Sequence, residues 1–278
     1  MHPAHITLSA LLLAAAASSA IAHDTWFARA PADAGPGALA LGTGNLYPKQ
    51  EFAIDPQYLA RQGCRSAAGT VQPLRTLRIS DVALLLAAPA AGTLTCWAQL
   101  QAFEIEIAAE HVALYLDEIR APKEMRERWA ALQARGVVWK ERYTKHARTL
   151  LASEPAAHSL PAGIDIGIDP DMNLDLRLAP GQAPPKVGMP VVFQLLSGGQ
   201  PLPGLALQFR SELSPLGFWA QTDAQGQVRM TVPLPGRWLL RGTELKPSVD
   251  RPDAWDSRFI TLAFEALPAP ARAIPTAP

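Results

Sequence analysis

Short apolar runs broken by Gly and Pro are the feature that most constrains the fold of this chain. Its 278 residues include 26 Pro and 19 Gly, and a Pro inside a helix removes a backbone hydrogen bond and clashes with the preceding turn. The apolar runs in the first third of the chain are short, and they cover residues 38–41, 74–79, 82–86 and 94–100. Runs of this length between Gly and Pro clusters predict strands, and therefore a β-rich region over residues 23–108.

The segment AFEIEI, residues 102–107, carries the clearest strand pattern. Phe103, Ile105 and Ile107 alternate with Glu104 and Glu106, which is the period-two pattern of a strand with one solvated face. We therefore interpret the two glutamates as surface residues rather than as a catalytic carboxylate pair.

The middle of the chain predicts a helical insertion over residues 109–151. Met125, Trp129 and Leu132 follow a helical spacing, Pro122 suits a first helical turn, and Gly136 stands where such a helix would end. The flanking stretches EHVALYLDEI and WKERYTKHARTLL also favour helical or turn-rich structure.

Strand and turn signals return in the last third of the chain. Gly198-Gly199 lies between two apolar runs and predicts a hairpin, and Pro203-Gly204 predicts a further turn. Short strands at regular spacing predict an immunoglobulin-like or transthyretin-like β-sandwich over residues 161–266. The fold class is therefore mainly β, with an N-terminal β-rich domain (23–160) that carries the helical insertion, a C-terminal β-sandwich, and a disordered Pro- and Ala-rich tail (267–278).

The N-terminus has the features of an export signal. An apolar run over residues 6–17 precedes the triplet Ala20-Ile21-Ala22, which fits the small-x-small rule for signal-peptide cleavage. We expect residues 1–22 to be removed, so that His23 becomes the N-terminus of a periplasmic protein. The apolar run is near or below the length needed to span a bilayer, and no apolar segment of that length follows it, so the processed protein is not expected to cross a membrane.

Charge and cysteine content narrow the functional classes. Lys and Arg together number 25, as do Asp and Glu, so no broad positive field exists to attract nucleic acid. The only cysteines are Cys64 and Cys96, and in an exported chain such a pair predicts a disulfide, with two unrelated buried thiols as the alternative. Neither cysteine has a second ligand at the close spacing typical of cysteine metal sites.

Several motifs together resemble a known bacterial family. These are His23-Asp24 followed by Trp26 and Phe27, the stretch YLDE at 115–118, KERYTKHAR at 140–148, and the C-terminal stretches GGQPLPGLALQ, TDAQGQV, LPGRWLL and WDSRFITLAFE. In their order and spacing they are similar to the periplasmic domain-of-unknown-function family associated with nickel or cobalt uptake, the NikM-like group.

The resemblance implies an N-terminal all-β portion with a helical insertion, a C-terminal β-sandwich and a role in metal handling. One departure concerns the stretch RWLLRGTELKPS, which lacks a His that relatives often place after the Trp-Leu-Leu strand. If that His belongs to a metal site in relatives, the site implied for this chain is smaller than theirs, or different.

A processed N-terminal histidine has an unusual capacity to bind metal. Its α-amine and imidazole Nδ1 can hold one ion together, and nitrogen ligands favour Cu(II) or Ni(II). We expect a third ligand from His111, His146 or His158, or from a nearby carboxylate such as Asp24. His146 is the first choice among them, because it lies in the YTKHAR stretch. In the alternative interpretation, His23 only opens the first strand and His146 caps or packs a helix.

The chain shows none of the nucleophile-elbow, zinc-protease, phosphate-loop or dinucleotide motifs, so a non-enzymatic role is expected. The leading hypothesis is a protein that binds or delivers nickel, cobalt or copper to an inner- or outer-membrane transporter. An alternative is a β-sandwich module that binds envelope glycans or proteins without metal. A minor alternative is a copper-dependent oxidative enzyme with an N-terminal histidine brace.

Overall fold

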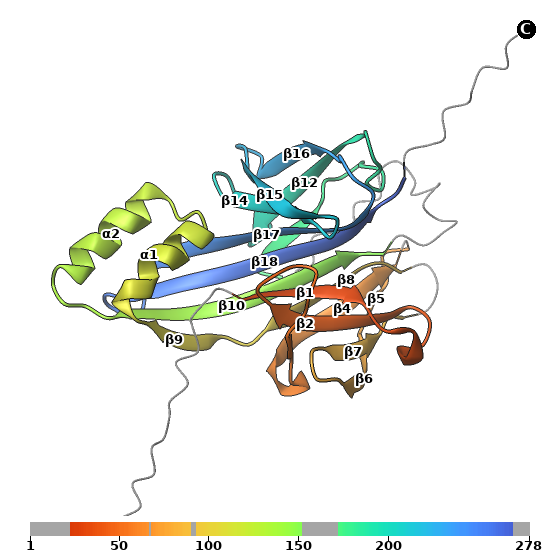
Figure 1. Cartoon of the computed structure of the whole chain (residues 1–278), viewed down its shortest axis with the longest axis horizontal. Helices are drawn as coiled ribbons and strands as arrows, with labels where there is room; N and C mark the ends of the chain where they lie inside the picture. Colours follow the sequence, from red (N-terminus) through yellow and green to blue (C-terminus); the bar gives the residue numbers. More distant parts are fainter. Residues whose placement is uncertain (1–22, 67, 90–92, 152–171, 269–278) are drawn as a thin grey trace, which may run out of the picture.

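The computed structural model describes residues 23–66, 68–89, 93–151 and 172–268 (Figure 1). The predicted signal segment 1–22, residues 269–278 of the predicted tail, and His158 lie outside these residues. Within the described part of the chain the strands form three sheets, and only two α-helices accompany them. The predicted mainly-β class is therefore confirmed. No helix of the described residues is long and apolar enough to cross a membrane.

The largest sheet has nine strands and runs through the centre of the molecule. In spatial order these are β15 (Ser214–Gln221), β14 (Ala206–Ser211), β17 (Gly236–Pro247), β18 (Trp255–Ala266), β10 (Trp139–Leu150), β8 (Thr93–Leu100), β4 (Leu59–Ser66) and β5 (Val71–Gln72), with β9 (Phe103–Ile107) also paired to β10. The pairing of β10 with β18 is parallel, and it joins strands from both predicted domains. The two halves of the chain therefore share one sheet.

Two smaller sheets pack against this central sheet. A five-stranded sheet contains β1 (Asp24–Arg29), β2 (Ala38–Gly44), β7 (Leu84–Ala87), β6 (Arg75–Ile79) and β3 (Phe52–Ala53). A four-stranded sheet contains β11 (Leu174–Leu178), β12 (Pro190–Ser197), β13 (Gln200–Pro201) and β16 (Gln227–Thr231). Because alternate residues of a strand point to opposite faces, the central sheet can bury side chains against both neighbours.

Each interface between sheets has its own apolar core. Phe27 and Leu41 of the five-stranded sheet share a cluster with Ala147 of β10. On the other side, Phe193 of the four-stranded sheet shares a cluster with Phe209 and Leu262. The predicted resemblance of the C-terminal half to an immunoglobulin- or transthyretin-like sandwich stays a prediction.

The helices α1 (Ala109–Glu118) and α2 (Lys123–Gln133) cover one end of the long strands (Figure 1). Met125, Trp129 and Leu132 are buried on one face of α2, as their spacing predicts. They pack around Trp139 and Trp255, whose rings stack at 4.6 Å between centroids. An amphipathic stripe alone is a weak source of helix stability, so this aromatic contact is what holds the helix to the sheet.

The predicted helical insertion is longer than the helical segment in the structure. The last helix of this segment, α2, ends at Gln133. Residues 139–150, which we expected to be helical or turn-rich, form strand β10. The reason lies in tertiary structure, because β10 pairs with β18 along one edge and with β8 and β9 along the other. Main-chain hydrogen bonds on both edges override the local preference of a charged stretch.

The turn and disulfide predictions are confirmed. Gly198 and Gly199 adopt positive φ values of 55° and 78° between the paired strands β12 and β13, a conformation that glycine adopts without steric cost. Cys64 of β4 and Cys96 of β8 face each other in register and form a disulfide.

Candidate functional site

His23 lies immediately before β1 and is half-buried. Its ring meets the edge of the Phe52 ring at 5.4 Å between centroids. Burial and the nearby charge of Lys145 lower the pKa of His23 below 6.5, while Glu51 and Asp24 act in the opposite direction. The imidazole is therefore mostly neutral at pH 7, which is the form that binds metals.

Asp24, the second predicted ligand, forms an ion pair with Arg241. Its side chain is 6% exposed, and its Oδ2 lies 2.7 Å from Nη1 of Arg241 on β17. A carboxylate that neutralises a buried guanidinium is costly to withdraw from that pair. Asp24 therefore anchors β1 to the central sheet, and it is a poor candidate for a metal ligand.

His146, the third predicted ligand, lies on a strand and not on a helix as one interpretation assumed. It is buried, with Nδ1 3.2 Å from the Phe259 carbonyl oxygen and Nε2 2.8 Å from Oδ1 of Asn173. Each ring nitrogen therefore lies within hydrogen-bond distance of an oxygen atom, and a neutral ring can donate to only one of them. Burial lowers the pKa of His146 to about 4, so the ring is neutral at pH 7 and has a single N–H to donate.

His23 and His146 belong to opposite faces of the central sheet. Lys145 interacts electrostatically with His23 and Asp24, so its side chain lies on the face that β1 covers. His146 is the next residue along β10 and points to the other face, where it meets Asn173, just before β11. The structure brings His23 and Asp24 together and leaves His146 apart from them.

Lys145 is a residue of this region that the sequence analysis did not single out. Burial lowers its pKa to about 8, and the ammonium nitrogen lies 5.6 Å from the centre of the Tyr143 ring. Within the described part of the chain it forms no ion pair. The family-like stretch KERYTKHAR contains it, and this was the one signal that could have pointed to it.

Across the described residues, no three His, Cys, Asp or Glu side chains come together in an arrangement that could hold a metal ion. As far as the described residues are concerned, a metal at His23 would therefore be held mainly by atoms of His23 itself. The free α-amine of a processed N-terminus would supply one such atom in addition to the ring.

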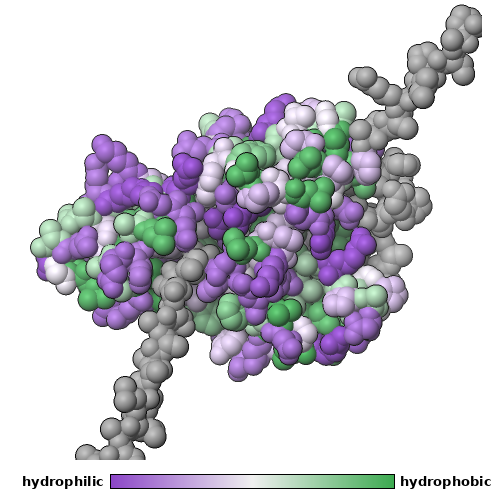
Figure 2. Space-filling model, viewed as in Figure 1, coloured by the Kyte–Doolittle hydropathy of each residue, from purple (hydrophilic) through white to green (hydrophobic). Residues whose placement is uncertain are grey.

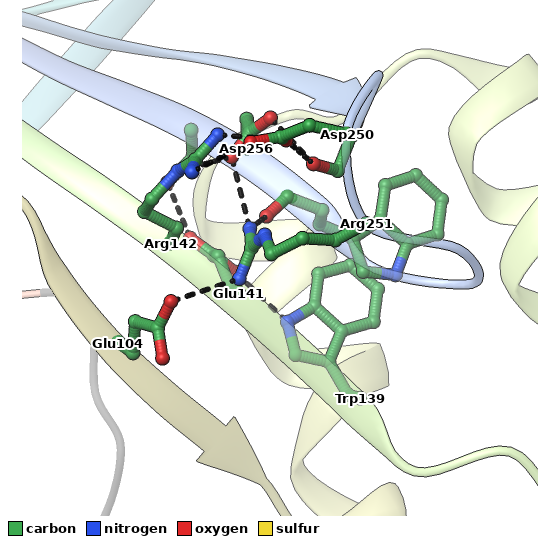
Figure 3. A network of polar contacts seen from close by, with 10 residues as sticks. Glu104, Trp139, Glu141, Arg142, Asp250, Arg251 and Asp256 are labelled. Atoms are coloured by element: carbon green, nitrogen blue, oxygen red, sulfur yellow. Dashed lines mark hydrogen bonds and ion pairs between the residues drawn. The ribbon is translucent and has the colours of Figure 1, made fainter.

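The same family-like stretch also contains a buried carboxylate with a structural role, Glu141 (Figure 3). Its Oε1 accepts hydrogen bonds from the hydroxyls of Tyr115, at 2.8 Å, and Ser257, and its Oε2 accepts one from Trp139 Nε1 at 2.8 Å. Burial raises the pKa of Glu141 despite these donors. Glu141 thus connects β10 to helix α1 and to β18.

Arg142 and Arg251 hold the loop between β17 and β18 (Figure 3). Arg142 donates to Asp250 at 2.9 and 3.0 Å and to Asp256 at 3.0 Å, and these bonds lower the pKa of Asp250 to about 2. Arg251 donates to Asp256 at 2.9 Å and to the Trp255 carbonyl at 2.7 Å. The network fixes the loop over the end of β10.

A cavity of about 340 Å³ lies beside this network, between the β9–β10 pair and the loop. Its lining carries charges of both signs. Glu104 lies 3.4 Å from Arg251, and Glu106 lies 3.4 Å from Lys140. Because these charges neutralise one another, the cavity presents little net charge to a ligand.

No protein-family model matches the chain, and no curated protein matches it. The resemblance to the NikM-like group therefore stays a hypothesis drawn from sequence patterns.

Proposed function

We propose that the processed protein is a periplasmic metal-binding protein that holds nickel, cobalt or copper at His23 and delivers it to a membrane transporter. The observation that carries the proposal is the half-buried, neutral imidazole of His23 at the start of β1. With residues 1–22 removed, the α-amine and the ring of this residue form a nitrogen chelate, which favours Ni(II) or Cu(II).

Glu51 takes the place of Asp24 and His146 as the third ligand in this proposal. It exerts a larger electrostatic effect on His23 than Asp24 does. Its Oε2 accepts a hydrogen bond from the Asn45 backbone at 3.1 Å, and its Oε1 lies 4.0 Å from the exposed Lys49 ammonium. The Asn45 hydrogen bond therefore orients the Glu51 carboxylate. Its contact with Lys49 is longer and more exposed than the Asp24–Arg241 ion pair, so Glu51 is easier to use as a metal ligand.

The proposed role is non-enzymatic. An oxidative copper enzyme with a histidine brace needs a second histidine that faces the metal, and His146 points to the other face of the central sheet. The Cys64–Cys96 disulfide supports export, because disulfides persist in oxidising compartments. The resemblance to the NikM-like group supports a transporter as the partner.

The test compares variants of the mature protein, after intact-mass analysis has established that the exported chain starts at His23. One variant carries a single additional Ala before His23, so that the imidazole stays and only the terminal amine moves. Titration with Ni(II), Co(II) and Cu(II) at pH 7 should show affinity at least tenfold weaker than for the native protein, equivalent to about 1.4 kcal/mol. His23→Ala should weaken binding at least as much, and Glu51→Gln should weaken it by a smaller factor.

His146→Ala serves as the matched control, because it removes a histidine from the opposite face of the same sheet. This variant should keep the native metal affinity. An Ala-extended protein that binds as tightly as the native one would exclude the terminal chelate. Absence of metal binding together with capture of envelope glycans or proteins would instead favour the metal-independent binding module.

A further inference from the structure

The face of the central sheet that adjoins β1 carries a row of polar side chains. On β14, Gln208 lies opposite Trp219 of β15 and opposite Arg241 of β17. Residues directly opposite each other in antiparallel strands share a face, so these three side chains stand side by side. Arg241 also pairs with Asp24 of β1, which places the row next to His23.

Positive charge gathers along this row, and we call Arg120, Arg210, Arg241 and Lys145 the cationic face. The guanidinium carbons of Arg120 and Arg241 lie 5.3 and 5.8 Å from the centre of the Trp219 ring. Burial and the adjacent charge of Arg241 lower the pKa of Arg210. In Figure 2 the middle of the visible face carries hydrophilic residues with hydrophobic ones among them.

Among the described carboxylates, only Asp24 forms an ion pair with a residue of the cationic face. Asp24 pairs with Arg241, and Glu51 lies beside Lys49 at the edge of the region. Glu118 is in contact with Arg241 through its backbone carbonyl, at 3.4 Å. Within the described residues, Lys145, Arg120 and Arg210 form no ion pair, so the face keeps an excess of positive charge.

Arg120 is held in this position at a conformational cost. It follows helix α1 with a φ of 52°, in the left-handed region that favours glycine after a helix. An arginine at this position places a charged side chain where glycine would adopt the positive φ at a lower steric cost. Strain of this kind is often retained where a side chain has a function.

This charge pattern weakens the binding of a bare metal dication at His23, because like charges repel in a half-buried site. A metal that arrives as a complex with a small polycarboxylate carries a net negative charge, and the same cations then attract it. We propose that the ligand of the His23 site is an anionic complex of the metal with a small polycarboxylate chelator, whose carboxylates bind the cationic face. This inference rests on the proposed function and specifies the substrate class of the same site.

The probe is citrate, which is a tricarboxylate and a nickel chelator. The mature protein is dialysed to equilibrium against labelled citrate with and without equimolar Ni(II), and Ni(II) binding is titrated separately in a non-coordinating buffer. We expect more citrate to be retained with Ni(II) than without it, because the metal adds its bonds to His23 to the attraction of the cationic face. Arg120→Gly, which suits the positive φ, should weaken citrate retention about tenfold and should not weaken the binding of Ni(II) alone.

Lys145→Gln should change the two measurements in opposite directions. It removes an attraction for the anionic complex and a repulsion for the bare ion, so citrate retention should fall while the affinity for Ni(II) alone rises. Arg229→Gln is the matched control, because Arg229 is exposed on β16, in a different layer. It should behave as the native protein does.

The possible results separate the two proposals. Ni(II) binding without citrate retention overturns the chelator proposal and leaves the metal-binding function standing. Equal citrate retention with and without Ni(II) also overturns it, because the site would then recognise the free anion. Absence of Ni(II) binding in both conditions overturns both proposals.

Discussion

Arg148 of β10 and Asp175 of β11 form an ion pair at 2.8 Å in which both side chains are fully buried. The Arg148 guanidinium also lies 5.5 Å from the centre of the Trp97 ring and donates to the Thr95 hydroxyl at 3.3 Å. The pair connects the central sheet to the four-stranded sheet inside an apolar core.

Breaking this pair should be costly. Arg148→Met leaves the Asp175 carboxylate buried without its counter-charge, and loss of one partner of a buried pair typically costs about 3–5 kcal/mol. Urea unfolding should show a lower free energy of unfolding of this size. The double variant Arg148→Met/Asp175→Leu should recover most of the loss, because no charge then remains buried.

The control for this comparison is an exposed pair. Arg78 and Asp33 lie 2.6 Å apart with side chains 48% and 70% exposed, and such pairs contribute less than about 1 kcal/mol. Arg78→Gln should therefore change the free energy of unfolding little. Equal losses for Arg78→Gln and Arg148→Met would contradict the importance given to burial.

The disulfide should stabilise the protein mainly by restricting the unfolded chain. Cys64 and Cys96 are separated by 32 residues, and a loop of this size corresponds to about 3–4 kcal/mol in the chain-entropy treatment. Cys64→Ser/Cys96→Ser should lower the free energy of unfolding by this amount. Native protein under reducing conditions should behave like the variant, whereas the variant itself should not respond to reductant.

His146 should make stability depend on pH. Its pKa is about 4 in the folded protein and about 6.5 when unfolded, so the unfolded state takes up the proton first. The stability contributed by the neutral ring is fully present above pH 6.5 and is lost as the pH falls toward 4. At pH 4.5 the loss amounts to about 2–3 kcal/mol. The free energy of unfolding should fall less between pH 7.5 and 4.5 in His146→Gln than in the native protein. Equal slopes would contradict the assignment.

The Tyr115 hydroxyl should stabilise the helical end of the molecule through Glu141. Tyr115→Phe removes one donor to a buried carboxylate, and hydrogen bonds to charged groups contribute about 1.5–3 kcal/mol. Urea unfolding should reveal a loss in this range. Tyr58→Phe, at a partly exposed position, is the control and should have a much smaller effect.

The local spacing of apolar residues was sufficient to predict several elements of the fold. The alternation in residues 102–107 predicted β9, whose Ile107 is buried and whose Glu104 and Glu106 are exposed. The spacing of Met125, Trp129 and Leu132 predicted helix α2 and its buried face. These features are local because side-chain periodicity and backbone preference act within a few residues.

The sequence by itself therefore determined the mainly β class, most strand positions, the turns at glycine and the disulfide partners. Only the tertiary structure decided that residues 139–150 form a strand, since β10 exists through its parallel pairing with β18, more than a hundred residues away. That strand sends Lys145 toward His23 and the adjacent His146 to the opposite face. A candidate site depends on such long-range pairing because register and burial, which no local pattern encodes, decide which side chains meet.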